Sequence, residues 1–293
     1  MDTDVHIPDG FLSTPVWATL DAAALPAVAL ITRRAQRSFD EAKVPLLGVM
    51  GAFVFAAQMV NFPVGPGTSG HLVGGALLAL TLGPAAAGVV LAAILAIQAL
   101  VFQDGGILAL GANMMNMAVF GVLAGYLPYH FWGRTRARRV AIFAGGALSV
   151  LVSAVLALSE LLLSGVRMPG PVLGLSLGLF VVSALAEGAI TLAVVGALEA
   201  IQPDFIRHPA AGRSFALGAI AVVAVLLVTG GVLLASTSPD GIEKLGQAKT
   251  FLSTPLAGYE IPSLGDGWMP KVAAGLLGLG LVYGACSMIG RRR

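Results

Sequence analysis

The sequence predicts an all-α fold, a polytopic transmembrane helix bundle, from three observations. Of the 293 residues, 57% are apolar and only 11% are charged, whereas soluble domains carry about 25% charged residues. Mean hydropathy is +0.89. Apolar runs long enough to cross a bilayer, about 20 residues each, recur along the whole chain. We therefore expect a multi-pass protein of the cell (inner) membrane, in contact with lipid throughout.

Nine apolar segments are predicted to span the membrane, at 12–32, 44–61, 70–83, 84–103, 107–130, 140–164, 171–200, 214–236 and 270–290. The third segment is short, so Gly83-Pro84 is expected to turn the chain between it and the fourth. A basic stretch from Arg207 to Arg213 follows the seventh span. We interpret it as the boundary between a seven-helix domain, 1–205, and a two-helix C-terminal module, 206–293, with an extracytoplasmic loop at about 236–270.

The basic residues favour an orientation with the N-terminus outside and the C-terminus inside. Cytoplasmic loops carry an excess of Lys and Arg, and in this orientation most of the 17 basic residues fall inside. The basic residues left outside are Arg167, Lys244, Lys249 and Lys271. The outer side then receives the N-terminal stretch, the loop Asn61–Gly70, the loop Gln103–Gly106 and the loop at about 236–270.

The composition and the missing motifs exclude several classes of function. A net charge of +2 gives no reason to expect a nucleic-acid partner. The single cysteine, Cys286, excludes a disulfide within the chain and a Cys-based zinc site. The chain has no HExxH, no GxSxG and no GxxxxGK[ST] pattern. We therefore expect a transport component that is not an enzyme, with any ATP hydrolysis in a separate subunit.

Two of the four histidines are predicted to lie on the outer side. His6 belongs to the N-terminal stretch, and His71 follows the glycine-rich loop 65–70, while His130 and His208 fall at the cytoplasmic edge. His71 alone fits an interfacial residue that caps a helix. Both histidines together favour a metal site. Two imidazoles with backbone nitrogens form an all-nitrogen set that suits square-planar Ni(II) or Cu(II) better than Mg²⁺ or Ca²⁺, which prefer oxygen ligands.

Several amide side chains lie near the predicted outer ends of spans. They are Asn61, Gln98, Gln103, Asn113 and Asn116. Asn113 and Asn116 are three residues apart and are expected to share one helix face. Two interpretations remain open: the amides join neighbouring helices by hydrogen bonds, or they surround the histidines and orient them. Asp21, Glu160 and Glu187 lie within spans, where carboxylates face a bundle interior or a partner, and the sequence leaves their role open.

Three motifs resemble the CbiM/NikM family, the substrate-binding membrane components of energy-coupling-factor cobalt and nickel transporters. The motifs are His6-Ile7-Pro8-Asp9-Gly10-Phe11-Leu12, then Asn61-Phe62-Pro63-Val64 with Gly67-Thr68-Ser69-Gly70-His71, and Gly111-Ala112-Asn113 with Asn116-Met117. The resemblance covers about residues 5 to 205. Ser238-Pro239-Asp240-Gly241-Ile242-Glu243 is similar to the Pro-Asp-Gly-Leu-Glu motif of the family's small partner, CbiN/NikN, so the chain resembles a fusion of both.

The resemblance implies capture of Ni²⁺ or Co²⁺ as the transported substrate, without an organic cofactor. It assigns the imidazole ligands to His6 and His71, with a terminal amine and a backbone amide nitrogen as further donors. It also implies a membrane coupling subunit (CbiQ/NikQ-like) and ATPase subunits (CbiO/NikO-like), in a system that can serve cobalamin biosynthesis. The sequence does not distinguish nickel from cobalt.

One departure concerns the position of the first histidine. In the family this His is residue 2, where the amine, the amide and the imidazole close small chelate rings, but here it is residue 6. We hypothesise that the product starts at Val5, because the valine codon GTG can serve as a bacterial start that is read as Met. Val5 would then supply an extra backbone ligand. N-terminal sequencing of the native protein decides this.

Two alternative functions remain at this stage. A proton-coupled secondary carrier of divalent transition metals would transport without ATPase subunits. A membrane metalloenzyme would turn over a substrate, and the missing general base argues against it.

Overall fold

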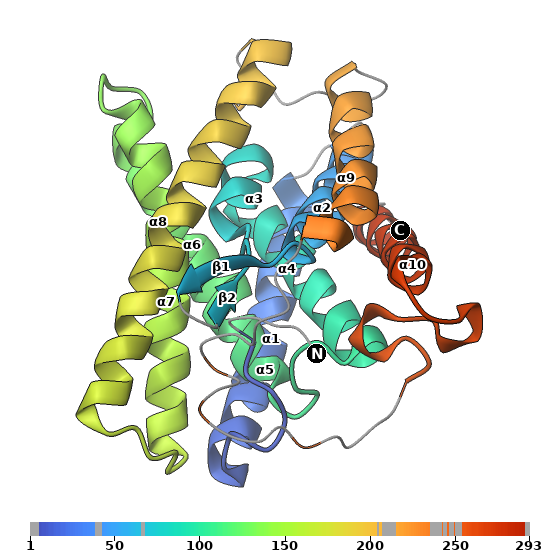
Figure 1. Cartoon of the computed structure of the whole chain (residues 1–293). Helices are drawn as coiled ribbons and strands as arrows, with labels where there is room; N and C mark the ends of the chain where they lie inside the picture. Colours follow the sequence, from blue (N-terminus) through green and yellow to red (C-terminus); the bar gives the residue numbers. More distant parts are fainter. Residues whose placement is uncertain are drawn as a thin grey trace.

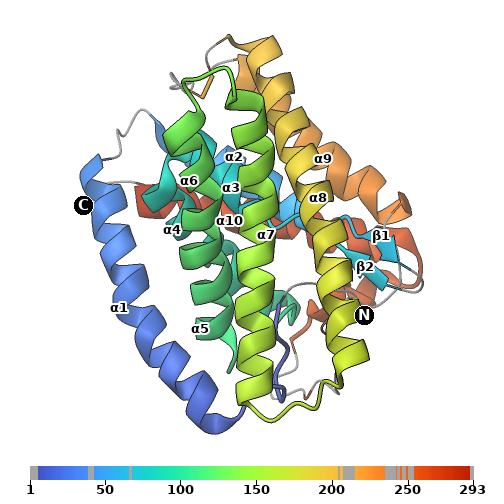
Figure 2. The same cartoon turned by 90° about the vertical axis from the view of Figure 1, so that its left-hand side faces the viewer.

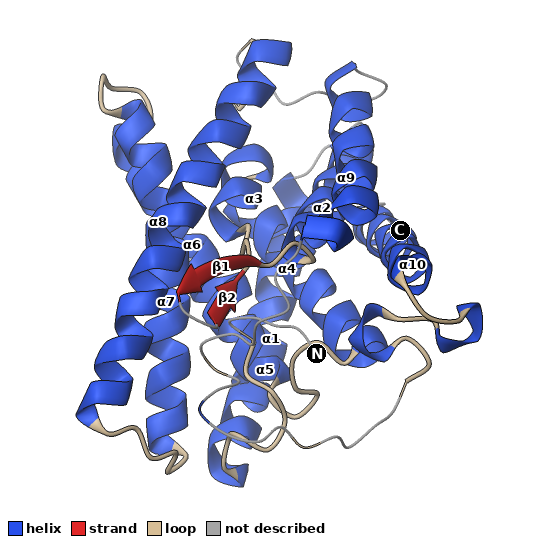
Figure 3. Ribbon diagram, viewed as in Figure 1, coloured by secondary structure: helices blue, strands red, loops and turns tan. Residues whose placement is uncertain are grey.

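The structure is a computed structural model that describes residues 6–38, 43–65, 68–203, 205–206, 215–234, 242, 245, 249 and 254–290. Helices dominate these residues, and two short strands form the one sheet among them (Figure 3). Among the described residues, six helical segments are long and apolar enough to cross a membrane. The predicted all-α membrane bundle is confirmed.

The helices and strands have the following bounds. They are α1 (Thr14–Ser38), α2 (Val44–Gln58), β1 (Phe62–Gly65), β2 (Thr68–Gly70), α3 (Gly75–Leu82), α4 (Pro84–Ile97), η2 (Gln98–Phe102), α5 (Leu110–Asn113), η3 (Met114–Gly121), α6 (Val122–Trp132), α7 (Arg138–Leu163), α8 (Gly170–Ile201), α9 (Phe215–Leu234), η5 (Ala257–Tyr259), η6 (Pro262–Leu264) and α10 (Trp268–Gly290). The segments η2 and η3 are π-helical and continue α4 and α5, while η5 and η6 are short 3₁₀ turns.

Each predicted span contains a helix, but the third predicted span, 70–83, is longer than the helix that it contains. The predicted span 70–83 holds only α3, which has eight residues and is therefore about 12 Å long. A helix must be about 20 residues long to cross the hydrocarbon core, so α3 does not span it alone. The predicted turn is confirmed: Gly83 has a φ of +83° and joins α3 directly to α4.

The segment before α3 enters the bundle as a β-hairpin. Strands β1 and β2 pair antiparallel, and Figure 1 shows the hairpin among the helices, beside α8. Thr68 and Ser69 are buried, and a Cβ on Gly70 would lie 2.9 Å from the hydroxyl oxygen of Ser183 on α8. Irregular backbone inside a membrane protein must be enclosed by protein, and the close contact with α8 supplies part of that enclosure.

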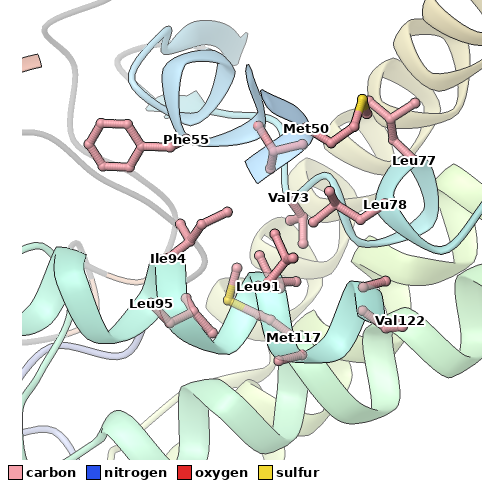
Figure 4. Close-up of a cluster of buried hydrophobic side chains, with 14 of the residues drawn as sticks. Met50, Phe55, Val73, Leu77, Leu78, Leu91, Ile94, Leu95, Met117 and Val122 are labelled. Carbon is pink, nitrogen blue, oxygen red and sulfur yellow. The ribbon is translucent and has the colours of Figure 1, made fainter. Parts of the chain in front are cut away.

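The apolar core lies around α3, whose side chains Leu77 and Leu78 are fully buried. Figure 4 shows them facing Met50 of α2, Leu91 of α4 and Met117 of η3. Because α3 is surrounded on all sides, its sequence is apolar all round, which is the pattern of a buried helix. The core thereby fixes where the hairpin and the loop 71–74 sit.

Helix α10, from the predicted C-terminal module, packs along α2. Figures 1 and 2 show α10 end-on and lengthwise, so it crosses α7 and α8 at a steep angle. A Cβ on Gly51 would lie 3.0 Å from the sulfur of Cys286, and Gly278 packs against the ring of Phe55. The boundary between 205 and 206 stays a prediction, because 207–214 lie outside the described residues.

A carboxylate of α8 holds the loop between β2 and α3. The backbone N–H groups of Val73 and Gly74 donate to Oε2 and Oε1 of Glu187, each at 2.8 Å. Glu187 is fully buried, and Gly74 has a φ of +76°, which glycine adopts without strain. One of the three intramembrane acids left open by the sequence therefore anchors this loop.

We expect Glu187→Gln to lower the free energy of unfolding by about 1–3 kcal/mol, because one carboxylate oxygen becomes an NH₂ group that faces a buried amide N–H. Thermal unfolding in detergent micelles measures this. The matched control is Glu199→Gln on the same helix, whose Oε1 accepts a hydrogen bond from Arg138 at 2.5 Å in a partly exposed position. The control should change stability by at most about 1 kcal/mol. Equal losses in both variants would contradict the anchoring role.

Candidate metal site

The N-terminal segment is held against the loop before α5 by Asp9. Its carboxylate accepts hydrogen bonds from the N–H groups of Ile107, at 3.0 Å, and Leu108, at 2.8 Å. Its carbonyl oxygen accepts a third from the N–H of Lys249 at 2.8 Å. The chain turns at Asp9-Gly10, and the Asp9 side chain ties this turn to a distant loop.

Asn113 fixes the backbone directly after His6. The N–H of Ile7 donates to Oδ1 of Asn113 at 2.8 Å, and Nδ2 of Asn113 donates to the carbonyl oxygen of Ile7 at 3.1 Å. That carbonyl also accepts the N–H of Gly106 at 2.9 Å. Asn113 is thus one predicted amide that lies beside the histidines and positions the segment that carries His6.

The two predicted histidines come together inside the protein. Their ring centroids are 5.6 Å apart with planes inclined by 51°. Both side chains are 2% exposed. His6 is carried by the segment that Asp9 and Asn113 hold, and His71 by the loop that Glu187 holds. Two distant parts of the sequence therefore deliver two imidazoles to one buried place.

His71 presents a neutral imidazole with a defined tautomer. Its Nδ1 lies 2.7 Å from the carbonyl oxygen of Leu72. A carbonyl oxygen only accepts, so Nδ1 carries the proton and Nε2 keeps the lone pair. Burial first, and the neighbouring His6 second, lower the pKa of His71 to about 3. The ring is therefore uncharged at neutral pH and is able to bind a cation.

His6 is bound by a carboxylate that the sequence analysis did not include in the site. Its Nδ1 lies 3.1 Å from Oδ1 of Asp104, and the hydroxyl of Tyr259 donates to Oδ2 of the same carboxylate. Both residues are buried. The sequence placed Asp104 in the outer loop 103–106, but no sequence signal connected it, or Tyr259, with His6.

Gln98 contributes to the support of the His71 loop through a second amide. Its Nε2 donates to Oε1 of Gln58 at 3.0 Å, and Nε2 of Gln58 donates to the carbonyl oxygen of Val73 at 2.9 Å. The sequence analysis did not single out Gln58. These two hydrogen bonds join α4 and α2 to the loop that carries His71. Gln98 therefore joins neighbouring helices and also supports the surroundings of a histidine, as the two interpretations of the amides expected.

The remaining predicted residues do not all reach the histidines. Asn116 donates to Oε2 of Glu160 at 2.8 Å and so joins η3 to α7. Asn113 instead holds the backbone of Ile7, so the two amides have different partners. Asn61 is buried just before β1, Gln103 is half-buried at the end of η2, and Val5 lies outside the described residues.

The other intramembrane acids have structural partners. Glu160 accepts the hydrogen bond from Asn116, and Oδ1 of Asp21 accepts the N–H of Gly111 at 2.7 Å. Each contact joins two helical segments.

The site brings together two imidazoles, which are nitrogen donors, and the Asp104 carboxylate, which contacts His6. In the described part of the chain, no three His, Cys, Asp or Glu side chains are arranged to hold one metal ion. Two imidazoles alone leave coordination positions unfilled, so a metal bound here would take further donors from backbone groups, from residues before His6 or from water. Such a set suits a late first-row transition metal ion.

Comparison with known proteins agrees with this chemistry. Residues 6–205 match the family model CbiM, described as the cobalt uptake substrate-specific transmembrane region. A protein of Archaeoglobus fulgidus with the provisional name fused nickel transport protein NikMN is 35% identical over 289 residues, covering 95% of each chain. The cobalt transport protein CbiM of Acetoanaerobium sticklandii is 30% identical, covering 68% of this chain and 86% of its own.

Solved structures give the same result. A crystal structure of a transition metal transporter has a TM-score of 0.60 at 33% identity, covering 69% of this chain and 96% of that chain. A truncated transition metal transporter has a TM-score of 0.58 at 35% identity, covering 66% and 97%. With the family model matched over residues 6–205 and a fused NikMN relative matched over nearly the whole length, this chain belongs to the CbiM family, in the fused form that joins it to a NikN-like module.

Proposed function

We propose that this protein captures Ni²⁺ or Co²⁺ on the extracytoplasmic side of the cell (inner) membrane, as the metal-binding component of an ATP-driven energy-coupling-factor importer. The observation that carries the proposal is the pair of buried imidazoles, His6 and His71, with centroids 5.6 Å apart. Relatives named as nickel and cobalt transport proteins support it. The extracytoplasmic side follows from the distribution of Lys and Arg.

The proposed ligands are the imidazoles of His6 and His71, with backbone nitrogen as the further donor type. Val5 is the proposed source of such a nitrogen, as an amine if the native product starts there. Asn113 and Gln98 belong to the polar surroundings through Ile7 and Gln58. Nitrogen donors bind Ni²⁺ more tightly than Co²⁺ in the general affinity order, and the supply of each ion in the cell would decide which is carried.

The energy source is proposed to lie outside this chain. The sequence contains no phosphate-binding motif of the form GxxxxGK[ST]. A membrane coupling subunit and ATPase subunits, CbiQ/NikQ-like and CbiO/NikO-like, are the proposed partners. The intramembrane carboxylates Asp21, Glu160 and Glu187 each accept a hydrogen bond from the protein, as structural residues do, which favours this proposal over a proton-coupled carrier.

The first prediction of the proposal is that His71→Ala abolishes tight metal binding while the protein stays folded. Loss of a direct ligand should weaken the affinity by more than the roughly 100-fold that loss of a ligand's hydrogen-bond partner can cost. Isothermal titration of the detergent-solubilised full chain with Ni²⁺ and Co²⁺ measures this.

The matched control is His130→Ala, which removes an exposed imidazole on α6. It should bind both metals as the wild type does. Wild-type affinity in folded His71→Ala protein would refute the site.

The second prediction concerns the energy source. Vesicles that contain this chain with the coupling and ATPase subunits should accumulate Ni²⁺ or Co²⁺ only when ATP is supplied on the ATPase side. Radioactive metal uptake measures this, with a proton gradient alone as the comparison. Uptake by this chain alone, driven by a proton gradient, would instead establish the secondary carrier.

A further inference from the structure

We infer that an anionic phospholipid binds in a groove between α1, α4 and α10. The groove lies at the ends of α1 and α10 that face the cytoplasm in the orientation favoured by the basic residues. Its empty volume is about 350 Å³, which includes the space at its open mouth. Ligand pockets in proteins measure roughly 300–1,000 Å³, so the groove is large enough to hold part of a small molecule. It is separate from the metal site.

The groove exists because α1 and α10 both pack against α4 and leave a space between them. Helix α4 forms the floor with Val89 and Val90, both of which are buried. Ala35 of α1 and Gly290 of α10 line the sides, and neither has a side chain large enough to fill the space. Figure 2 shows the C-terminal end of the chain beside the upper part of α1.

The lining of the groove fits a hydrocarbon chain. Its deep part consists of buried apolar side chains, among them Val89, Val90 and Cys286, and its one polar lining residue, Gln36, is exposed at the edge. An unfilled apolar groove loses the dispersion contacts that its lining atoms would otherwise make. In a bilayer the neighbouring hydrocarbon is available to make them, so we assign the groove to an acyl chain.

The groove is also open to lipid on the side of α1. Only 6% of the most apolar stretch of α1 is buried inside the protein, and its side chains Leu25 and Leu30 are 75% and 52% exposed. Helix α1 is therefore a peripheral helix, and an acyl chain reaches the groove without passing through the bundle.

Positive charge beside the groove selects the head group. Arg33 and Arg37 are exposed on α1, each within four residues of both Ala35 and Gln36. An arginine side chain can extend along apolar surface and place its guanidinium group at the membrane interface. Basic pockets between transmembrane helices on the cytoplasmic side bind anionic lipid head groups, so a lipid phosphate without a compensating choline fits this position.

The sequence around the groove has the same sign of charge. Arg291, Arg292 and Arg293 follow Gly290 directly. The segment after α1 contains two acidic residues, Asp40 and Glu41, and the basic residues outnumber them. The charge therefore favours an anionic phospholipid over a zwitterionic one with the same acyl chains.

A lipid in this groove would join two parts of the chain. Helices α1 and α4 belong to the region 6–205 that matches the family model, whereas α10 belongs to the C-terminal part. A ligand that binds only the folded protein stabilises it. We therefore expect phosphatidylglycerol to raise the unfolding temperature of the delipidated full chain in detergent, and phosphatidylcholine to raise it less.

Native mass spectrometry of the full chain tests the inference, with phosphatidylglycerol and phosphatidylcholine of identical acyl chains in competition. The wild type should retain one phosphatidylglycerol molecule in preference. The double variant Arg33→Gln/Arg37→Gln should bind it about 20-fold more weakly, because each arginine near the membrane surface contributes about fivefold. The matched control is Arg136→Gln/Arg139→Gln, which removes two exposed arginines elsewhere and should bind as the wild type does.

A second pair of variants tests the groove itself. Ala35→Phe should fill the groove and abolish the retained lipid, whereas Ala29→Phe, at an exposed position of the same helix, should keep it. If Ala35→Phe does not fold, the arginine variants still decide the matter. A phosphatidylglycerol with a photoreactive diazirine at the end of one acyl chain should label peptides that contain Val89 and Val90 or Cys286.

Three results would overturn the inference. The first is equal retention of the two lipids by the wild type, and the second is labelling confined to α7 and α8, which would indicate only the surrounding bilayer. The third is loss of the labelled lipid when the coupling subunit binds, because the groove would then be a protein interface. A weaker binding of phosphatidylglycerol in the control pair equal to that in Arg33→Gln/Arg37→Gln would contradict the assignment to this groove.

Discussion

Two imidazoles buried in an apolar bundle need hydrogen-bond partners, and the structure around the site depends on this constraint. A polar group taken out of water without a partner costs several kcal/mol, roughly 2–7 in transfer experiments. His6 is bound by Asp104 and His71 by the carbonyl of Leu72. Each contact involves Nδ1 of the imidazole, so each ring is held in one orientation by a partner from its own surroundings.

The partners of the histidines must themselves be supported. Asp104 lies on a loop and accepts the Tyr259 hydroxyl, while the His71 loop is held by Glu187 and Gln58. Backbone that is neither helical nor sheet-paired has to find such partners inside a membrane protein. A short buried helix, α3, and the β-hairpin before it replace one continuous span. The side chains of Glu187 on α8 and Gln58 on α2 bind the backbone of the loop between the hairpin and α3. The loop that interrupts the helical span is therefore the same loop that carries His71 to the site.

The sequence predicted most of the bundle because hydropathy reports lipid exposure and burial alike. For the same reason it could not show that 70–83 is a buried helix of eight residues preceded by a strand, since a buried helix is as apolar as a span. Motif resemblance and topology placed His6 and His71 on one side. Nothing in the local sequence could reveal Tyr259, whose contact with Asp104 joins residues 155 positions apart. The partner of Asn116 is Glu160, 44 positions away in the sequence, which no composition rule predicts.

We propose that one metal ion is held by both imidazoles in an all-nitrogen or nitrogen-rich environment. X-ray absorption spectroscopy of the full chain loaded with Ni²⁺ checks this, because multiple scattering from imidazole rings reveals how many of them bind the ion. We expect a first shell of light donors, without sulfur, and scattering from two imidazoles. A shell that contains sulfur, or that lacks the scattering of a second imidazole, would contradict it.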